Sequence, residues 1–379
     1  MINKDVKTII VFLLLIISFW QNLTFIFSNR EYFTRHFDPQ FFSRLYSESQ
    51  YVKGQASEGG IGDDGLYAFA GYYYLFQKGD VSSVNFEHPP LGKYLIGLSI
   101  LLFNNENIIN LIYYALLLFF TYKLAKIILR SVSLSFLAVC LISIDPLIHD
   151  HLLRSLLDLP FTLFFVVAVY YYLLSFKNTN YTFISQLLLG MAFSTRFFPS
   201  LILIYTFFSL IKFLYQRKAF LQYFYTSFLI PIIYMLSHIS FFYYHPSIIE
   251  FIRHKIWMLS WFKGSVIIMG NIWRNLFTGY YIDSTGKIQI NQYWTIILPI
   301  TLVLAITRVR KNLIKKDNYQ ILVIYFTSVI YLIYLTFLTG GLEKFFMPIY
   351  PLIIILALSN ISCIIETCRK WNLRRLKAR

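Results

Sequence analysis

Charged residues are scarce in this sequence. Asp, Glu, Lys and Arg make up only 14% of the 379 residues, whereas a soluble domain carries about a quarter. Hydrophobic residues reach 57%, and they recur in runs of about twenty, the length that spans a bilayer. The composition therefore predicts an all-α polytopic membrane protein and disfavours a soluble core.

Cysteine and the common catalytic motifs are also rare or missing. The three cysteines, Cys140, Cys363 and Cys368, lie in or beside apolar runs. They lack metal-ligand spacing and are too few for a disulfide framework. The sequence has no Walker loop, no GxSxG or HExxH motif and no Cys/His zinc spacing. Any chemistry must therefore rest on other residues.

Apolar runs predict about ten transmembrane helices. They lie at about residues 8–27, 108–129, 132–149, 157–176, 182–196, 197–216, 220–242, 293–308, 319–339 and 345–365. The first run follows Lys4 and Lys7, as in a signal peptide, but no small-residue cleavage site comes after it. We therefore interpret it as an uncleaved first transmembrane helix.

The basic residues indicate an orientation. With the N-terminus in the cytosol, the cytosolic flanks hold 20 of the 34 basic residues and only Asp5, Asp317 and Glu366 as acids. This is the positive-inside pattern, and it accounts for the net charge of +16 without a nucleic-acid partner. We expect both termini to be cytoplasmic in a prokaryotic plasma or inner membrane, with anionic membrane lipids as partners.

This topology places two long segments on the outer face. They are residues 29–107, the first outer loop, and residues 243–292, the second outer loop. The first outer loop is aromatic, and two helices at the interface are predicted within it, at about 64–77 and 90–103. No separate soluble domain is indicated, so residues 1–379 are predicted to form a single transmembrane domain.

Ionisable residues near membrane depth are costly and need a partner or a function. Here they gather at the predicted outer face, and they are Asp63, Asp64, His88, Lys93, Arg154, Asp158, Arg196 and Lys344. Their position predicts a site at the outer interface that combines acids and bases.

Asp63 and Asp64 are adjacent carboxylates among three glycines. Their repulsion can raise one pKa and so provide a general base. The alternative is that they cap a helix beginning near Gly65, where free N–H groups and the helix dipole favour carboxylates. The two interpretations are compatible.

Four cations follow along the chain. Lys93 ends the segment His88-Pro-Pro-Leu-Gly-Lys93, where the prolines suit a helix start and the lysine can meet a phosphate. Arg196 lies between two apolar runs, and Lys344 follows a Gly-Gly turn. For Lys93 and Arg196 the alternative is a snorkelling side chain. Arg154 and Asp158 have the i, i+4 spacing of a helical ion pair, but an Arg fork also suits a lipid phosphate.

These stretches, in this order, resemble the GT-C glycosyltransferases of the protein O-mannosyltransferase type, which include the lipid A aminoarabinose transferase. The matching segments are Asp63-Asp64, Gly79-Asp80, His88–Lys93, Arg154–Asp158, Gly190–Arg196 and Lys344–Pro351. Asp64 stands where the family usually has Glu, and Lys344 where Arg is common. The resemblance implies a GT-C fold.

The resemblance also implies a reaction. A sugar, mannose or a related hexose or pentose, would pass with inversion from a polyprenyl or dolichyl phosphate to a hydroxyl of a protein, lipid or glycan. Asp63 would be the base, and Asp64 or His88 would orient the acceptor or bind a metal. Lys93, Arg154, Arg196 or Lys344 would stabilise the departing phosphate, with Asp158 beside them.

No cofactor is required by the sequence, although a divalent metal ion with carboxylate ligands is an additional hypothesis. Two other functions stay open: a transporter or flippase of a lipid-linked sugar, and a noncatalytic member of the family. The clustering of charge at one face and the lack of a convincing internal repeat favour the enzyme over a transporter.

Overall fold

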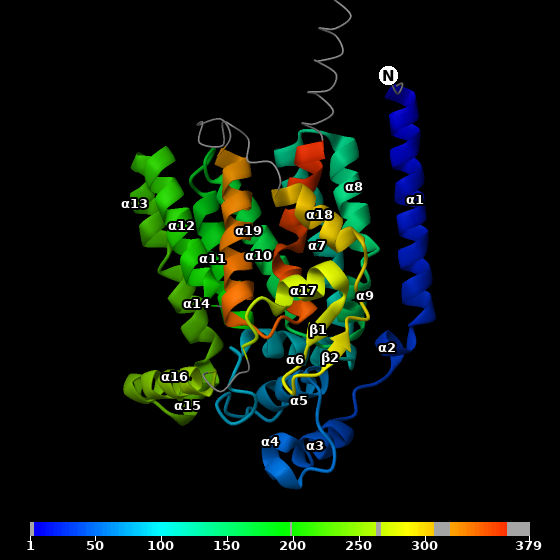
Figure 1. Ribbon diagram of the computed structural model, residues 1–379. Helices are drawn as coiled ribbons and strands as arrows, with labels where there is room; N and C mark the ends of the chain where they lie inside the picture. The colour runs from blue at the N-terminus through cyan, green and yellow to red at the C-terminus, as the bar shows by residue number, and fades with distance from the viewer. Residues whose placement is uncertain (1–3, 198, 263–266, 307–318, 362–379) are drawn as a thin grey trace, which may run out of the picture.

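A computed structural model describes residues 4–197, 199–262, 267–306 and 319–361 of the chain. These residues form a bundle of helices, with a single two-stranded sheet among them (Figure 1). The predicted class, a mostly helical membrane protein, is therefore confirmed.

A largely buried helix lies in the interior of the bundle. Helix α10 (Asp158–Leu174) is apolar nearly all round, and most of its residues are buried, as expected for a helix enclosed by others. The other helices of the bundle are α1 (Lys4–Ser28), α7 (Ile108–Leu129), α8 (Val132–Ser143), α9 (Pro146–Leu153), α11 (Tyr181–Thr195), α12 (Ser200–Tyr215), α13 (Arg217–Thr226), α14 (Leu229–Ser237), α18 (Ile297–Ile306) and α19 (Tyr319–Leu338). A last helical stretch, Glu343–Ile361, begins with the 3-10 helix η3 (Glu343–Ile349).

Five helices of the described residues are long and apolar enough to cross a membrane, and a sixth span results if α8 and α9 are counted together. The chain is thus a multi-pass membrane protein, while the predicted number of ten spans stays a prediction. The predicted span 220–242 corresponds to the candidate span Arg217–Ser237, which α13 and α14 form together, and the short helix α15 (Ile239–Tyr244) follows it. The predicted spans 293–308 and 345–365 lie partly outside the described residues.

The bend between α8 and α9 has a local cause. The two helices meet at 57°, where Asp145 is followed by Pro146 at the first position of α9. Proline suits that position but cannot continue the preceding helix. The Asp145 carboxylate accepts hydrogen bonds from the N–H groups of Leu147 and Ile148, and so caps the new helix.

Both predicted outer loops lie at one end of the bundle, opposite the end at which α1 begins (Figure 1). The first outer loop contains α2 (Glu31–Thr34), α3 (Pro39–Ser47), α4 (Gln50–Lys53), the 3-10 helix η1 (Gly54–Ala56), α5 (Asp63–Leu75) and α6 (Leu91–Phe103). The second contains α16 (Ile248–Phe262), α17 (Asn271–Thr278) and the antiparallel hairpin of β1 (Tyr280–Ile282) and β2 (Ile288–Ile290). Which side of the membrane this end faces stays a prediction.

Helices α5 and α6 match the predicted ranges 64–77 and 90–103 closely. They pack at two glycines. A Cβ atom on Gly71 would lie 2.6 Å from the backbone oxygen of Lys93, and one on Gly97 would lie 2.4 Å from the backbone oxygen of Gly71. The missing side chains therefore let the two helices touch, and this contact fixes the start of α5 relative to the start of α6.

Candidate active site

A cavity of about 820 Å³ lies between the two outer loops and the ends of the bundle helices. Four of the predicted site residues line it: Asp63, His88, Arg196 and Lys344. The structure therefore brings together residues from four of the separate segments that the sequence singled out.

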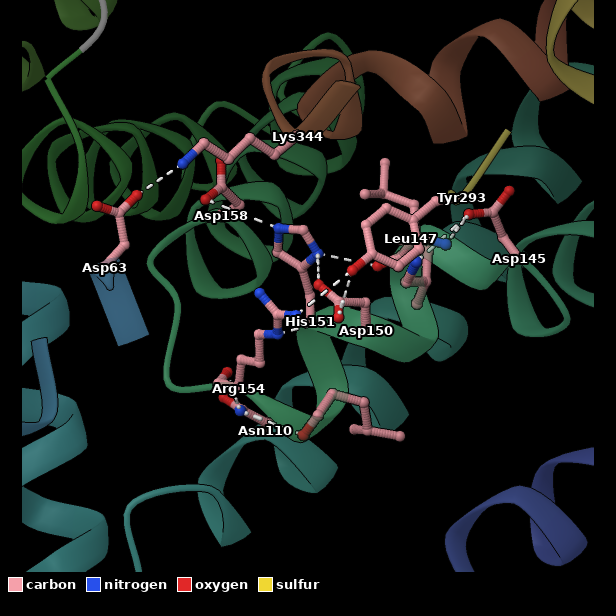
Figure 2. Close-up of polar contacts among 12 residues, drawn as sticks. Asp63, Asn110, Asp145, Leu147, Asp150, His151, Arg154, Asp158, Tyr293 and Lys344 are labelled. Atoms are coloured by element: carbon pink, nitrogen blue, oxygen red, sulfur yellow. Dashed lines mark hydrogen bonds and ion pairs between the residues drawn. The ribbon is translucent and has the colours of Figure 1, made fainter. Parts of the chain in front are cut away.

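Asp63 and Lys344 meet in this cavity. The Lys344 ammonium donates a 2.6 Å hydrogen bond to the Asp63 carboxylate, and the two side chains point toward one another in Figure 2. The pair joins the first residue of α5 to η3. It places an acid and a cation side by side at the bundle end.

The pKa of Asp63 reflects two opposing effects. Burial raises it, but the Lys344 charge and hydrogen bond lower it, with smaller contributions from Arg196 and His88. The net result is a pKa below the ordinary value, so the carboxylate is ionised at neutral pH.

The predicted capping role of the two acids is wrong in its details. Helix α5 begins at Asp63 rather than near Gly65, and its N-cap residue, Gly62, makes no side-chain cap. Both acids lie instead in the first turn, where the helix dipole still favours a carboxylate. Asp64 is not among the residues that line the cavity. Its backbone oxygen accepts a hydrogen bond from Ser155, and its catalytic role stays a prediction.

Arg196 is held by an acid from another helix. Its guanidinium forms an ion pair with Asp158, and the two side chains are 4% and 1% exposed. His151 lies behind Asp158, with its Nε2 atom 3.8 Å from a carboxylate oxygen (Figure 2). On its other side, the guanidinium lies over the ring of Phe345, 5.0 Å from the centroid. Asp158 and Phe345 therefore fix Arg196 in the cavity wall.

The alternative interpretation, a helical pair of Arg154 with Asp158, is wrong. Arg154 follows α9 in an extended conformation, and Asp158 begins the next helix, so the two residues do not share a helical face. Arg154 pairs instead with Asp150, at 3.0 Å, and Asp150 also accepts a hydrogen bond from Tyr293 (Figure 2). Arg154 is 47% exposed and is not among the cavity residues, so its contact with phosphate stays a prediction.

Lys93 does not line the cavity, but it forms hydrogen bonds to residues that do. The side chain is fully buried, and its ammonium donates hydrogen bonds to both oxygens of Asn85 and to the backbone oxygen of His88. Burial lowers the pKa of Lys93 to about 7. These bonds fix the turn that presents Asn85, Glu87 and His88 to the cavity.

His88 stands in this turn as a neutral group. Burial, followed by the charges of Arg196 and Lys93, lowers the pKa of His88 well below its ordinary value. The geometry provides no set of ligands for the hypothesis of a metal at Asp64 and His88. Within the described residues, no group of three or more His, Cys, Asp or Glu side chains is placed to hold a metal ion.

Several site residues were not predicted. Glu87, Tyr51, Tyr67 and Asn85 line the cavity, and His151 supports the Asp158–Arg196 pair. Glu87 directly precedes His88, so its place in the same polar segment could have identified it as a site residue. His151 gave no comparable signal, because a histidine in an apolar helix is usually a packed core residue.

Two comparisons with known proteins bear on this site. Residues 87–241 match the family model described as dolichyl-phosphate-mannose-protein mannosyltransferase. This range includes His88, Lys93, Arg154, Asp158 and Arg196, but not Asp63 or Lys344. Among curated protein sequences no match is found.

The structure is similar to two crystal structures of ArnT from Cupriavidus metallidurans. For the apo state the TM-score is 0.57 at 12% identity, over 85% of this chain and 59% of that chain. For the structure bound to undecaprenyl phosphate the TM-score is 0.60 at 13% identity, over 80% of this chain and 56% of that chain. The chain thus spans less than two thirds of the length of either ArnT chain.

Proposed function

Because the predicted resemblance to the GT-C glycosyltransferases is confirmed by the fold and by the family match, we propose that this chain transfers a sugar from a polyprenyl phosphate to an acceptor hydroxyl. The reaction takes place in the cavity that Asp63 and Lys344 share. The observation that carries the proposal is this pair: an ionised acid and a cation in direct contact, on a cavity wall that also holds Arg196.

The donor phosphate binds between Arg196 and Lys344. Both cations line the cavity, and both lie near the ring of Phe345, at 5.0 and 5.8 Å from its centroid. An Arg fork and a Lys ammonium both suit phosphate oxygens. The same cavity has an apolar side formed by Phe197, Pro199, Leu259, Ile267, Ile268 and Leu338, which suits the first isoprene units of the carrier. The ArnT structure with undecaprenyl phosphate supports a lipid phosphate as ligand.

Asp63 acts as the general base in the proposed reaction. It removes the proton of the acceptor hydroxyl while the hydroxyl oxygen attacks the anomeric carbon of the sugar. The bond between that carbon and the phosphate oxygen breaks, and its electron pair stays on the phosphate. Attack from the side opposite the phosphate inverts the configuration. Lys344 and Arg196 stabilise the charge that develops on the leaving phosphate.

Lys344 has a different partner before and after donor binding. Without donor it neutralises Asp63, and a bound phosphate competes for the same ammonium. Moving Lys344 toward the phosphate releases Asp63 from its hydrogen bond and raises its affinity for a proton. Donor binding therefore makes Asp63 a stronger base.

A transfer assay tests this function. Purified protein is supplied with labelled polyprenyl-phosphate mannose and a panel of hydroxyl acceptors, and Asp63→Asn is compared with Glu58→Gln. Glu58 is an exposed acid of the same loop that lies outside the cavity. Loss of a general base lowers the rate about 100-fold or more, so Asp63→Asn is expected to lose transfer while Glu58→Gln keeps it.

Two outcomes would overturn the proposal. Transfer by Asp63→Asn at the wild-type rate would exclude Asp63 as the base. If the wild-type protein neither transferred nor hydrolysed any lipid-linked sugar, while vesicles containing it moved the sugar lipid across the bilayer, the chain would be a flippase instead.

A further inference from the structure

Two groups of residues that line the cavity differ in their chemistry. The ends of the bundle supply its cations, Arg196 and Lys344. The first outer loop supplies an acid, an amide and two aromatic rings: Glu87, Asn85, Tyr51 and Tyr67. We call this second group the loop wall. Asp63 also belongs to the first outer loop, and its bond to Lys344 marks the boundary between the two walls.

The loop wall is rigid. The Glu87 carboxylate accepts a 2.8 Å hydrogen bond from the Asn85 amide, and both oxygens of Asn85 are in turn bound by the buried Lys93. Asn85 has a positive φ of 47°, a conformation that few residues adopt without such support. Glu87 is 8% exposed, so its carboxylate is held in one place rather than moving freely in solvent.

The aromatic rings stand close to the acids. Burial, followed by the charges of Glu87 and Asp63, raises the pKa of Tyr51 to about 12. The ring of Tyr67 is buried and lies edge-on to His88, with centroids 6.1 Å apart. The loop wall therefore offers the exposed ring of Tyr51 and hydrogen-bonding groups together, next to the base.

The two walls also differ in position. The cations belong to the ends of α11 and of the last helical stretch, within the bundle, whereas α5 and α6 lie beyond its end (Figure 1). A phosphate on a lipid carrier comes from the membrane and meets the cations first. With the bundle in the membrane, the loop wall lies on the side from which a water-soluble acceptor would approach (Figure 1).

We propose that the loop wall is the acceptor site and that it takes a hydroxyl of a neutral carbohydrate. This inference rests on the proposed transferase function. A carboxylate and an amide bind sugar hydroxyls as hydrogen-bond partners, and the exposed ring of Tyr51 offers an apolar face to the C–H groups of a sugar ring. Once the donor phosphate occupies Arg196 and Lys344, the other acids that line the cavity besides Asp63 are Glu87 and Asp283, and they repel a phosphorylated acceptor.

The test uses the full-length protein in nanodiscs with labelled polyprenyl-phosphate mannose. The acceptors are neutral oligosaccharides, the same oligosaccharides carrying a phosphate monoester, and Ser/Thr peptides. We compare wild type, Glu87→Gln, which removes charge at constant shape, Tyr67→Phe, and the control Glu58→Gln. Binding of undecaprenyl phosphate is measured in parallel.

The wild-type protein is expected to transfer to the neutral oligosaccharides. It is expected to discriminate against their phosphorylated forms by about tenfold or more, because Glu87 and the phosphate carry like charges. Glu87→Gln reduces this discrimination without changing the Kd for undecaprenyl phosphate by more than about twofold. Tyr67→Phe raises the acceptor KM, because it removes a hydroxyl of the loop wall. Glu58→Gln changes neither the discrimination nor the acceptor KM.

Preference for the phosphorylated acceptor or for peptides would overturn the proposal, and so would discrimination that Glu87→Gln leaves unchanged. Transfer to water with no transfer to any oligosaccharide would also contradict it, while leaving the transferase function intact. A protein that neither binds undecaprenyl phosphate nor cleaves the donor would instead refute the transferase function itself.

Discussion

Lys344 and Asp63 are 281 positions apart in the sequence, yet the Lys344 ammonium lies 2.6 Å from the Asp63 carboxylate. The contact closes the chain's first outer loop onto the start of its last helical stretch. It also places an ionised acid where a lipid phosphate would compete for its partner. The predictions below follow from this pair and from the residues that support it.

The first prediction concerns the pH dependence of activity. In Lys344→Gln the ammonium that lowers the pKa of Asp63 is lost, while the burial that raises it remains. The acid limb of the kcat/KM profile, which reports the free enzyme, is therefore expected to move to higher pH. Lys287→Gln serves as the control, because Lys287 is an exposed residue outside the cavity. An unmoved limb in Lys344→Gln would exclude Asp63 as the group that titrates.

The second prediction concerns stability. The folded-state pKa of Asp63 is lowered, so the unfolded state binds more protons as the pH falls toward about 4. The contribution of the pair is therefore fully present above the unfolded pKa and is lost as the pH falls through the folded pKa. Thermal unfolding should show a Tm difference between wild type and Lys344→Gln at pH 7 that shrinks at pH 3. A difference that grew on acidification would contradict this sign.

The third prediction concerns Asp158 as the residue that positions Arg196. Asp158→Asn leaves a buried guanidinium without its counter-charge, a change that costs several kcal/mol when a buried pair is broken. We expect a higher donor KM, a weaker Kd for undecaprenyl phosphate and a lower Tm. Asp150→Asn is the matched control, because Asp150 also pairs with an arginine, but one that is 47% exposed.

The conservative variant Asp158→Glu distinguishes a role of Asp158 in positioning Arg196 from a role in stability alone. Asp158→Glu keeps the charge and is expected to recover donor binding in part, even if the Tm stays low. If Asp158→Asn and Asp150→Asn weakened donor binding equally, the position of Asp158 behind the cavity wall would have no special effect.

The fourth prediction concerns the glycine contact between α5 and α6. An added Cβ at Gly71 would meet backbone atoms of Lys93 and Gly97 at 2.6 and 2.8 Å, and backbone cannot move aside as a flexible side chain can. Gly71→Ala is therefore expected to destabilise the protein by about 1–3 kcal/mol. Gly59→Ala is the control, since nothing lies within 4 Å of its Cβ position. Equal Tm values for the two variants would show that the helices separate at no cost.

Local features of the fold could be predicted from the sequence. The range of α6 follows from Pro89 and Pro90 at its start, and α5 follows from the Gly-Asp-Asp segment before an aromatic run. Such signals act over a few residues, so one sequence is enough to find them. The exact end of a span is harder to predict. The candidate span that matches the expected range 220–242 ends at Ser237, and the ring of the next residue, His238, bonds to the backbone oxygen of Tyr234.

The pairing of the site residues could not be predicted in the same way. The spacing of Arg154 and Asp158 allows a helical pair as an alternative to phosphate binding, but the break between α9 and α10 separates them. The true partner of Asp158 comes 38 residues later, and the partner of Asp63 comes 281 residues later. Charge and hydropathy predict one membrane face for these residues, but only the packing of α10, α11 and η3 determines which of them touch.

The most direct test of the account is an exchange of the two charges. The double variant Asp63→Lys with Lys344→Asp keeps an ion pair across the same gap, but moves the acid to the bundle end and the cation to the first outer loop. The account predicts a Tm near that of wild type, or above those of the single variants, together with loss of sugar transfer from polyprenyl-phosphate mannose. Transfer by the exchanged protein at close to the wild-type rate would show that the pair only holds the fold together, and would contradict the assignment of Asp63 as the base.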